Sequence, residues 1–179
     1  NGELIAIGSR RPEAAKECLV KFAPQLEDKV QCFNGLDSVI NHERIDAIYL
    51  PMANEEHLAP ALKCIRAKKH LLIEKPMAIK SLDVEVLINE ARLHNVKIME
   101  GFMYAFHPQF DRIKNIIHSN IFGEILYALL YFSFPILPAL FHPNIRSISQ
   151  RGCALCDIGP YAFHTLRQCF KENALRADA

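Results

Sequence analysis

Short apolar runs alternate along the chain with amphipathic stretches long enough to form helices. This alternation is typical of a parallel sheet whose strands are joined by crossover helices. The apolar runs predict five strands, at residues 4–7, 30–33, 46–50, 70–73 and 97–100. The stretches between them predict four helices, at residues 12–22, 36–41, 56–67 and 81–94, with Ser81 as the cap of the last. The pattern therefore predicts an α/β fold with a doubly wound parallel sheet.

Beyond Gly101 the pattern changes and predicts a second domain. We expect a helix at 108–118, a long strand from Glu124, a Pro-rich loop and a helix at 157–170. The apolar stretch 125–141 carries no charged side chain, but Pro135 and Pro138 interrupt it. It is shorter than the roughly 20 residues of a membrane helix, so we interpret it as a strand buried on both faces. The predicted domains are residues 1–101 and 102–179.

Composition narrows the class of protein. The 179 residues include 21 Lys and Arg against 20 Asp and Glu, which gives a net charge of +1, and 50% are hydrophobic. Such a chain is globular and lacks the basic surface expected of a nucleic-acid binder. It is large enough to bury a core without disulfides, so its six cysteines indicate cytoplasmic thiols. The first residues are typical of a strand within a fold, and we expect a truncated N-terminus.

In a doubly wound sheet, ligands bind beyond the carboxyl ends of the strands. Ser9, Arg10 and Arg11 follow the first predicted strand. An NAD-selective site usually has an acidic residue here, whereas a hydroxyl and two guanidinium groups suit the 2′-phosphate of NADP. The alternative is a solvated basic turn before a helix.

Two further strand ends carry polar residues. Leu50 and Pro51 lead into Asn54 and His57, beside a helix start with free N–H groups, although Asn54 can also be a simple helix cap. The fourth strand ends at Glu74-Lys75-Pro76. A partly buried lysine at such a point suits a chemically tuned ammonium group, and the alternative is a structural ion pair.

The last predicted helix places Asp157, Tyr161 and His164 on one face, at spacings of four and three residues. A tyrosine beside a lysine can exchange a proton with a substrate hydroxyl, because the ammonium stabilises the phenolate. The alternative is an amphipathic helix with a capping Asp.

Cys153 and Cys156 form a single C-x-x-C pair, which suits a redox pair or half of a zinc site. The other four cysteines do not supply a second close pair, so we expect no metal. A thioredoxin-like pair would follow the first strand of its fold, whereas this pair comes late in the chain.

Three of these segments together resemble the Gfo/Idh/MocA oxidoreductases, the family of glucose-fructose oxidoreductase and inositol dehydrogenase. They are Glu74-Lys75-Pro76, the stretch 100–109 and the stretch 152–161, in the order the family has them. The Met-Tyr-Ala-Phe-His-Pro stretch at 103–108 is similar to the branch of dimeric dihydrodiol dehydrogenases and NADP-dependent D-xylose dehydrogenases. The resemblance implies a Rossmann domain, an α/β domain with an open sheet, and hydride transfer between a nicotinamide and a sugar or trans-dihydrodiol carbon.

The resemblance also assigns roles to individual residues. It implies that Lys75 orients the reacting hydroxyl, that Tyr161 exchanges its proton where other members have His, and that Asp157 holds the substrate. The implied cofactor is NADP rather than NAD, with the following contacts: Ser9 and Arg10 (with Arg11 beside them) at the 2′-phosphate, Leu50, Pro51, Asn54 and His57 along the cofactor, and Glu74, Lys75 and Pro76 near the nicotinamide ribose.

The chain departs from the family pattern at two points. The family's glycine-rich phosphate loop, with its strand and helix, would precede residue 1, and no G-x-G-x-x-G occurs in the sequence. The lost strand is central in the usual order, so we expect a gap in the sheet. Ala105 stands where the branch often has Arg, which removes any contact from that side chain.

These observations define the hypotheses. The first is an NADP-dependent dehydrogenase of a sugar or diol, forming a homodimer by analogy with the fold. The second is an inactive remnant that acts as an interaction or regulatory protein. The third is a thiol redox protein that uses Cys153 and Cys156.

Overall fold

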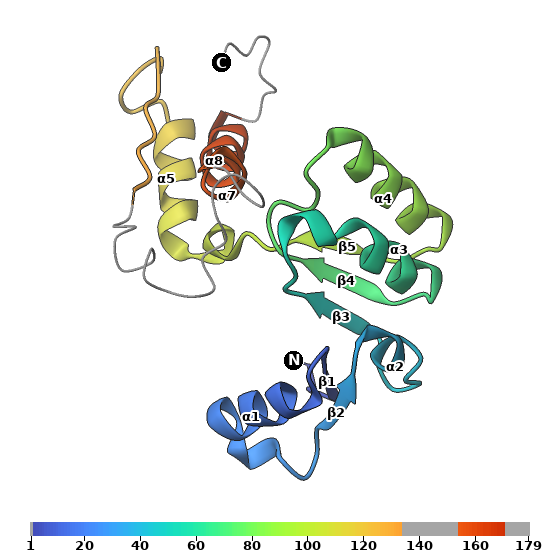
Figure 1. Cartoon of the computed structure of the whole chain (residues 1–179). Helices are drawn as coiled ribbons and strands as arrows, with labels where there is room; N and C mark the ends of the chain where they lie inside the picture. Colours follow the sequence, from blue (N-terminus) through green and yellow to red (C-terminus); the bar gives the residue numbers. More distant parts are fainter. Residues whose placement is uncertain (1, 134–153, 171–179) are drawn as a thin grey trace.

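The computed structural model describes residues 2–133 and 154–170 and shows an α/β arrangement (Figure 1). Parallel strands and helices alternate along the first 100 residues, and helices alone follow. The strands are β1 (Ala6–Ser9), β2 (Gln31–Asn34), β3 (Ala47–Leu50), β4 (His70–Ile73) and β5 (Ile98–Glu100). The helices are α1 (Pro12–Phe22), α2 (Leu36–Ile40), α3 (Leu58–Arg66), α4 (Ser81–Leu93), α5 (Pro108–His118), α7 (Ala154–Asp157) and α8 (Gly159–Phe170).

Most predicted elements are confirmed to within two residues, and local chemistry explains their ends. Pro12 and Pro108 occupy first-turn positions of α1 and α5, where the missing N–H costs nothing. Ser81 is not the cap of α4: Lys80 holds that position, and no side chain bonds there. The predicted helix at 157–170 is divided into α7 and α8, with Asp157 at the end of the first.

The sheet is in two parts. Strand β1 pairs with β2, and β3, β4 and β5 form a second parallel sheet in that order. Strands β1 and β3 do not pair, and both line a cavity of about 1060 Å³. Glu3 and Arg44 form an ion pair at 3.3 Å before the two strands, while Arg10 and Glu56 approach to 4.0 Å after them. The two strands therefore run in the same direction on either side of the cavity, and the predicted gap is confirmed.

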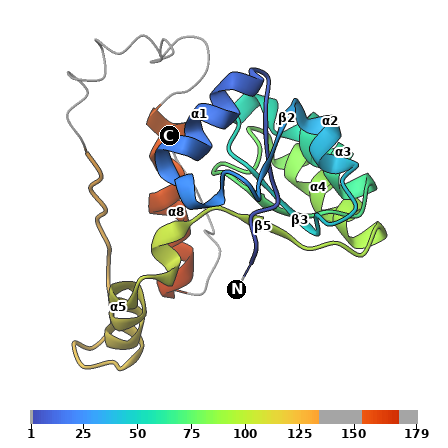
Figure 2. The ribbon, with the colours of Figure 1, turned by 90° about the horizontal axis from the view of Figure 1, so that it is seen from below.

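The core lies on the three-stranded part. Helices α3 and α4 pack side by side over one face of this sheet, as Figures 1 and 2 show. Their inward side chains meet the alternate, inward-facing residues of β3 and β4, as expected for apolar periods of 3.6 and 2. The fully buried apolar residues are Ala61, Cys64, Ile65, Ile73 and Leu87. This packing fixes the point where β4 ends.

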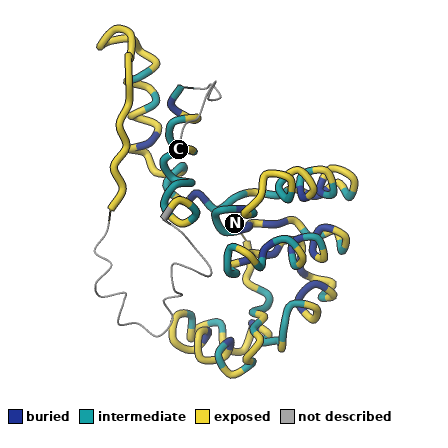
Figure 3. Tube along the Cα trace, turned by 45° about the horizontal axis from the view of Figure 1, so that its top comes forward, coloured by how far each residue is buried: buried dark blue, intermediate teal, exposed yellow. Residues whose placement is uncertain are grey.

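The long strand predicted from Glu124 is wrong for the residues that the structure describes. Residues 124–133 belong to no strand, and every one of them is exposed (Figure 3). No strand within the described part of the chain pairs with this segment, and an isolated strand leaves its backbone groups without partners. Residues 134–141 of the prediction lie outside the described residues.

In the described ranges, 2–133 and 154–170, no helix is both long and apolar enough to cross a membrane.

Candidate active site

Lys75 connects the end of β4 to α7, two segments that the sequence alone related only through the family resemblance. It follows β4 by two residues, and its side chain is 11% exposed. Its Nζ donates to Oδ1 of Asp157 and to the Asp157 backbone oxygen, both at 2.6 Å. Residues 82 positions apart in sequence thus form a charge-assisted pair. Asp157 stands at the end of α7, where its side chain remains 59% exposed.

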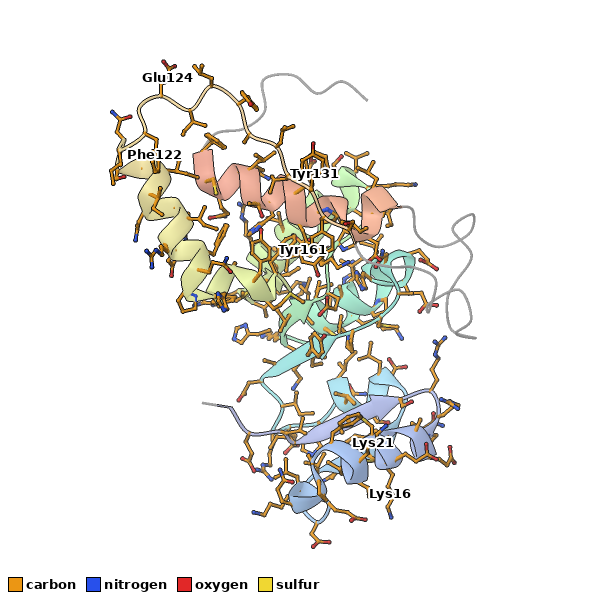
Figure 4. All side chains as sticks on the ribbon, turned by 90° about the vertical axis from the view of Figure 1, so that its left-hand side faces the viewer. Lys16, Lys21, Phe122, Glu124, Tyr131 and Tyr161 are labelled. Atoms are coloured by element: carbon orange, nitrogen blue, oxygen red, sulfur yellow. The ribbon has the colours of Figure 1, made fainter. Side chains whose placement is uncertain are left out.

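Tyr161 lies next to this pair, on the first turn of α8. The Lys75 Nζ is 5.1 Å from the centre of the Tyr161 ring, within the range of a cation–π contact. The ring is also parallel to that of Phe132, with 5.3 Å between centroids. The phenolic hydroxyl donates to Sδ of Met103 at 3.9 Å. Lys75 thus contacts the ring of Tyr161 in this structure, and the hydroxyl points elsewhere; Figure 4 shows Tyr161 on α8.

An aromatic cluster after β5 holds α8 in place. The Phe102 and His164 rings stack 4.1 Å apart, and Tyr104 Oη and His164 Nδ1 are hydrogen-bonded at 2.5 Å. Thr165 donates to the same Tyr104 oxygen at 2.9 Å. Burial lowers the pKa of His164 and raises that of Tyr104, which favours a neutral ring that accepts from a protonated phenol.

Sequence reasoning did not identify Phe102 and Tyr104 as part of the site, although both fall in the 100–109 stretch. The available signal was a run of aromatic residues directly after a strand that ends at the ligand-binding edge. His164, predicted on one face with Asp157 and Tyr161, contacts this cluster.

Glu74 does not form a side-chain ion pair with Lys75. Its Oε1 accepts the Tyr49 hydroxyl at 2.7 Å, and its Oε2 accepts the Lys75 backbone N–H at 3.3 Å. The hydrogen bond to Glu74 raises the pKa of Tyr49 to about 12. The structure therefore replaces the structural ion pair with two separate interactions and leaves the Lys75 ammonium directed at Asp157.

The basic turn after β1 is open to solvent. Ser9 Oγ accepts the Arg11 backbone N–H at 3.1 Å, while the Arg10 side chain is 81% exposed and only 4.0 Å from Glu56. Ser9 and Arg10 line the cavity beside Pro51 and Glu56. A hydroxyl and an exposed guanidinium can hold a phosphate group here.

The loop after β3 differs from the prediction in detail. Asn54 begins a 3-10 turn whose cap position is Ala53, and no side chain bonds at that cap. His57 is fully buried, and its ring nitrogens face the backbone oxygens of Met52 and Pro76. Its side chain therefore lies beneath the surface that a cofactor would touch. Leu50 is buried as well, with 3% of its surface exposed.

The strand ends thus form two groups of predicted residues. Lys75 contacts both Asp157 and the Tyr161 ring, and Ser9, Arg10 and Pro51 line the cavity between β1 and β3. Cys153 lies outside the described residues, so a Cys153–Cys156 redox pair stays a prediction. Residues 2–133 and 154–170 contain no cluster of three or more His, Cys, Asp or Glu that could hold a metal ion.

Residues 1–102 match the sequence profile of GFO_IDH_MocA, described as an oxidoreductase family with an NAD-binding Rossmann fold. The match covers more than half of the 179 residues. The chain belongs to this family. The Rossmann strand order accounts for the position of the gap, because the first strand of that order lies between the second and the fourth.

Two curated relatives illustrate the chemistry found in the Gfo/Idh/MocA family. A dTDP-3,4-didehydro-2,6-dideoxy-alpha-D-glucose 3-reductase of Saccharopolyspora spinosa is 30% identical over 92% of this chain and 47% of its own length. A trans-1,2-dihydrobenzene-1,2-diol dehydrogenase of Xenopus laevis is 29% identical over 94% of this chain and 48% of its own. The chain spans about half the length of the curated relatives it matches.

Solved structures agree with the fold. A 3-ketoreductase from Actinomadura kijaniata, in complex with TDP-benzene and NADP, gives a TM-score of 0.62 at 30% identity. This match covers 69% of the present chain and 37% of the reductase. A probable dehydrogenase from Thermotoga maritima matches with a TM-score of 0.74 at 20% identity, over 97% of this chain and 49% of its own, and supports the fold alone.

Proposed function

We propose that the protein is an NADP-dependent oxidoreductase that moves a hydride between the nicotinamide and a hydroxyl-bearing carbon of a sugar or trans-dihydrodiol. The observation that carries this proposal is the convergence of Lys75, Asp157 and Tyr161 from the two parts of the chain. A cation that contacts both a carboxylate and the ring of a phenol brings together the groups needed to bind a hydroxyl and move its proton. Relatives that reduce a keto sugar or oxidise a dihydrodiol support the same substrate class.

The residues at the end of β1 fit NADP. The Arg10 guanidinium and Ser9 hydroxyl would hold the 2′-phosphate, with Arg11 beside them, and the loop from Pro51 would lie along the cofactor. When bound, the nicotinamide gives or takes the hydride. The neighbouring 3-ketoreductase, solved with NADP, supports this choice over NAD.

The proton chemistry falls to Tyr161 and Lys75. In the reducing direction Tyr161 Oη gives its proton to the substrate oxygen, and in the oxidising direction it takes that proton back. The Lys75 ammonium, 5.1 Å from the ring centre, stabilises the phenolate that remains. The exposed Asp157 carboxylate accepts a substrate hydroxyl while it holds Lys75 in place.

The remaining predictions extend this proposal. We assign cofactor binding to residues 1–101 and substrate binding to residues 102–179, and we place the protein in the cytoplasm as a homodimer. Buried Cys64 and Cys169 thiols agree with a reducing compartment.

The test compares Lys75→Met with Lys80→Met, an exposed lysine five residues later. We expect NADPH-linked turnover of keto sugars or dihydrodiols by the full-length protein to fall about 100-fold or more in Lys75→Met, because the transition state loses a charge. The affinity for NADPH changes little, and Lys80→Met behaves as wild type. Equal loss of turnover and affinity would contradict the role of Lys75.

A further inference from the structure

His57 is the single fully buried charged or polar residue among residues 2–133 and 154–170. It stands at the junction between the 3-10 turn Asn54–Glu56 and helix α3. Its side chain cannot touch a ligand, so any effect on the site passes through its neighbours. Burial of a polar ring is costly unless its nitrogens are hydrogen-bonded.

Both ring nitrogens of His57 face backbone oxygens. Nδ1 lies 3.0 Å from the Pro76 oxygen, and Nε2 lies 3.1 Å from the Met52 oxygen. A carbonyl oxygen can only accept, and a neutral imidazole carries a single N–H. Both bonds therefore exist together only when both nitrogens carry hydrogen. Such a ring joins the loop after β3 to the loop after β4.

Glu100 contacts the loop after β4 as well. It lies on β5, which pairs with β4 on the side opposite to β3. It ends β5, and its Oε1 accepts the Met77 backbone N–H at 2.8 Å. Burial raises the pKa of the Glu100 carboxyl, while the Met77 N–H and the charge of His57 lower it. A carboxylate at Glu100 would offset the charge of a doubly protonated His57 below the surface. The residues after Lys75 are thus fixed through both Pro76 and Met77.

We infer that His57 is a positioning residue that, as a doubly protonated ring balanced by Glu100, fixes the backbone next to Lys75 and ties it to the predicted cofactor loop. Lys75 precedes Pro76 directly, so a shift of the Pro76 carbonyl moves the Lys75 ammonium relative to Asp157 and Tyr161. The consequence for turnover rests on the proposed function, whereas the bridge itself does not.

The first measurement determines the protonation of the His57 ring directly and does not depend on enzymatic activity. Long-range ¹H–¹⁵N NMR of the full-length protein, labelled at histidine, gives the number of N–H groups on each ring, and a His57→Gln sample assigns the His57 signals. We expect both His57 nitrogens to carry hydrogen, because each faces a backbone oxygen. A single N–H with one bare nitrogen would overturn the inference.

The second measurement separates positioning from simple stability. In His57→Leu both bonds are lost, and in His57→Gln the amide N–H₂ can keep one of them. We expect turnover to fall about 10- to 100-fold in His57→Leu, because the lysine is misplaced, with partial recovery in His57→Gln and little change in NADPH affinity. His94→Gln, at the C-cap of α4, is the matched control and keeps wild-type turnover.

The experiments distinguish a failure of the positioning role from a failure of the proposed function. Wild-type turnover in a folded His57→Leu protein would overturn the positioning role. If His57→Leu does not fold, His57→Gln decides, since full activity there, with one of the two bonds lost, contradicts the inference. If wild-type protein shows no hydride transfer, the proposed function fails and the NMR result still decides the bridge.

Discussion

The two parts of the divided sheet differ in how tightly their side chains are packed and in which candidate site residues they hold. In the three-stranded part, Ile65, Ile73 and Leu87 have no exposed surface. In the two-stranded part, β1 has no buried residue, and Phe22 at the end of α1 is 73% exposed. Lys75 belongs to the first part, and Ser9 and Arg10 belong to the second.

Because of this difference, the position of Lys75 is fixed by core packing, whereas the position of the turn at Ser9 and Arg10 depends on the gap in the sheet. The lysine site is held by a packed core and by His57 and Glu100. The turn at Ser9 and Arg10, which we propose binds the phosphate, lies beside the cavity. Ile5, Ala6 and Phe33 are only partly buried against the core there, and the ion pairs across the cavity are worth only about 0–1 kcal/mol each. We therefore expect catalytic geometry to be robust and cofactor selectivity to depend on the state of the gap.

Removal of the Tyr161 hydroxyl is expected to have the largest effect, and it tests the site around Lys75. Tyr161→Phe keeps the ring that contacts Lys75 and Phe132 but removes the hydroxyl that we propose as the proton donor. We expect turnover by the full-length protein to fall about 10²- to 10⁴-fold, with NADPH affinity little changed. Tyr127→Phe, at an exposed position, is the control. Near-normal turnover in Tyr161→Phe would assign the proton to another group.

Core truncation compares the packing of the two parts directly. We expect Ile73→Ala to lower the free energy of unfolding by about 2–5 kcal/mol, because it leaves a cavity within the large cluster. Leu19→Ala, at an equally buried position of α1, should cost less, since the few buried residues around it can collapse more easily. Urea unfolding followed by circular dichroism measures both. Equal losses would remove the distinction between the parts.

The selectivity for NADPH over NADH tests the role that we propose for the two-stranded part. Arg10→Ala should weaken NADPH binding about 10- to 100-fold and leave NADH binding unchanged, because a charge-assisted contact to the 2′-phosphate is lost. The exposed Arg92 on α4 provides the control Arg92→Ala. Parallel loss of both cofactors would place Arg10 away from the 2′-phosphate.

The smallest expected effect concerns the pH dependence contributed by Glu100. Burial raises its pKa in the folded protein, so the unfolded chain ionises first as pH rises. The carboxyl of Glu100 therefore lowers stability as pH rises from its unfolded pKa through its folded pKa. Glu100→Gln keeps an oxygen for the Met77 N–H, and its unfolding free energy should fall less steeply than that of wild type over this range. Parallel slopes would contradict the shift.

The order of elements in the first hundred residues was predictable because each strand is a short apolar run and each helix has an apolar face. Helix ends were less so: Ser81 has a good capping side chain, yet Lys80 takes that position because the chain enters α4 one residue earlier. The strand from Glu124 failed because apolar composition gives no information on whether a partner strand exists.

At the site, Lys75, Asp157 and Tyr161 were predicted from motifs that are distant in sequence, and the structure brings them into contact. The role of His57 was not predictable, because burial and the two carbonyl partners arise only when the loops after β3 and β4 meet. The partners of Glu74 were missed for the same reason, since Tyr49 lies on a neighbouring strand.

Fluorescence titration of NADPH and NADH shows whether the gap in the sheet limits cofactor binding. One sample is this chain, and the other carries, ahead of residue 1, a glycine-rich strand, loop and helix of the kind that the family resemblance predicts there. We expect tight and NADPH-selective binding by the extended chain, with weak binding by the shorter one, because the added strand closes the gap beside Ser9 and Arg10. Absence of binding by both, or equal binding of NADH and NADPH by the extended chain, would contradict it.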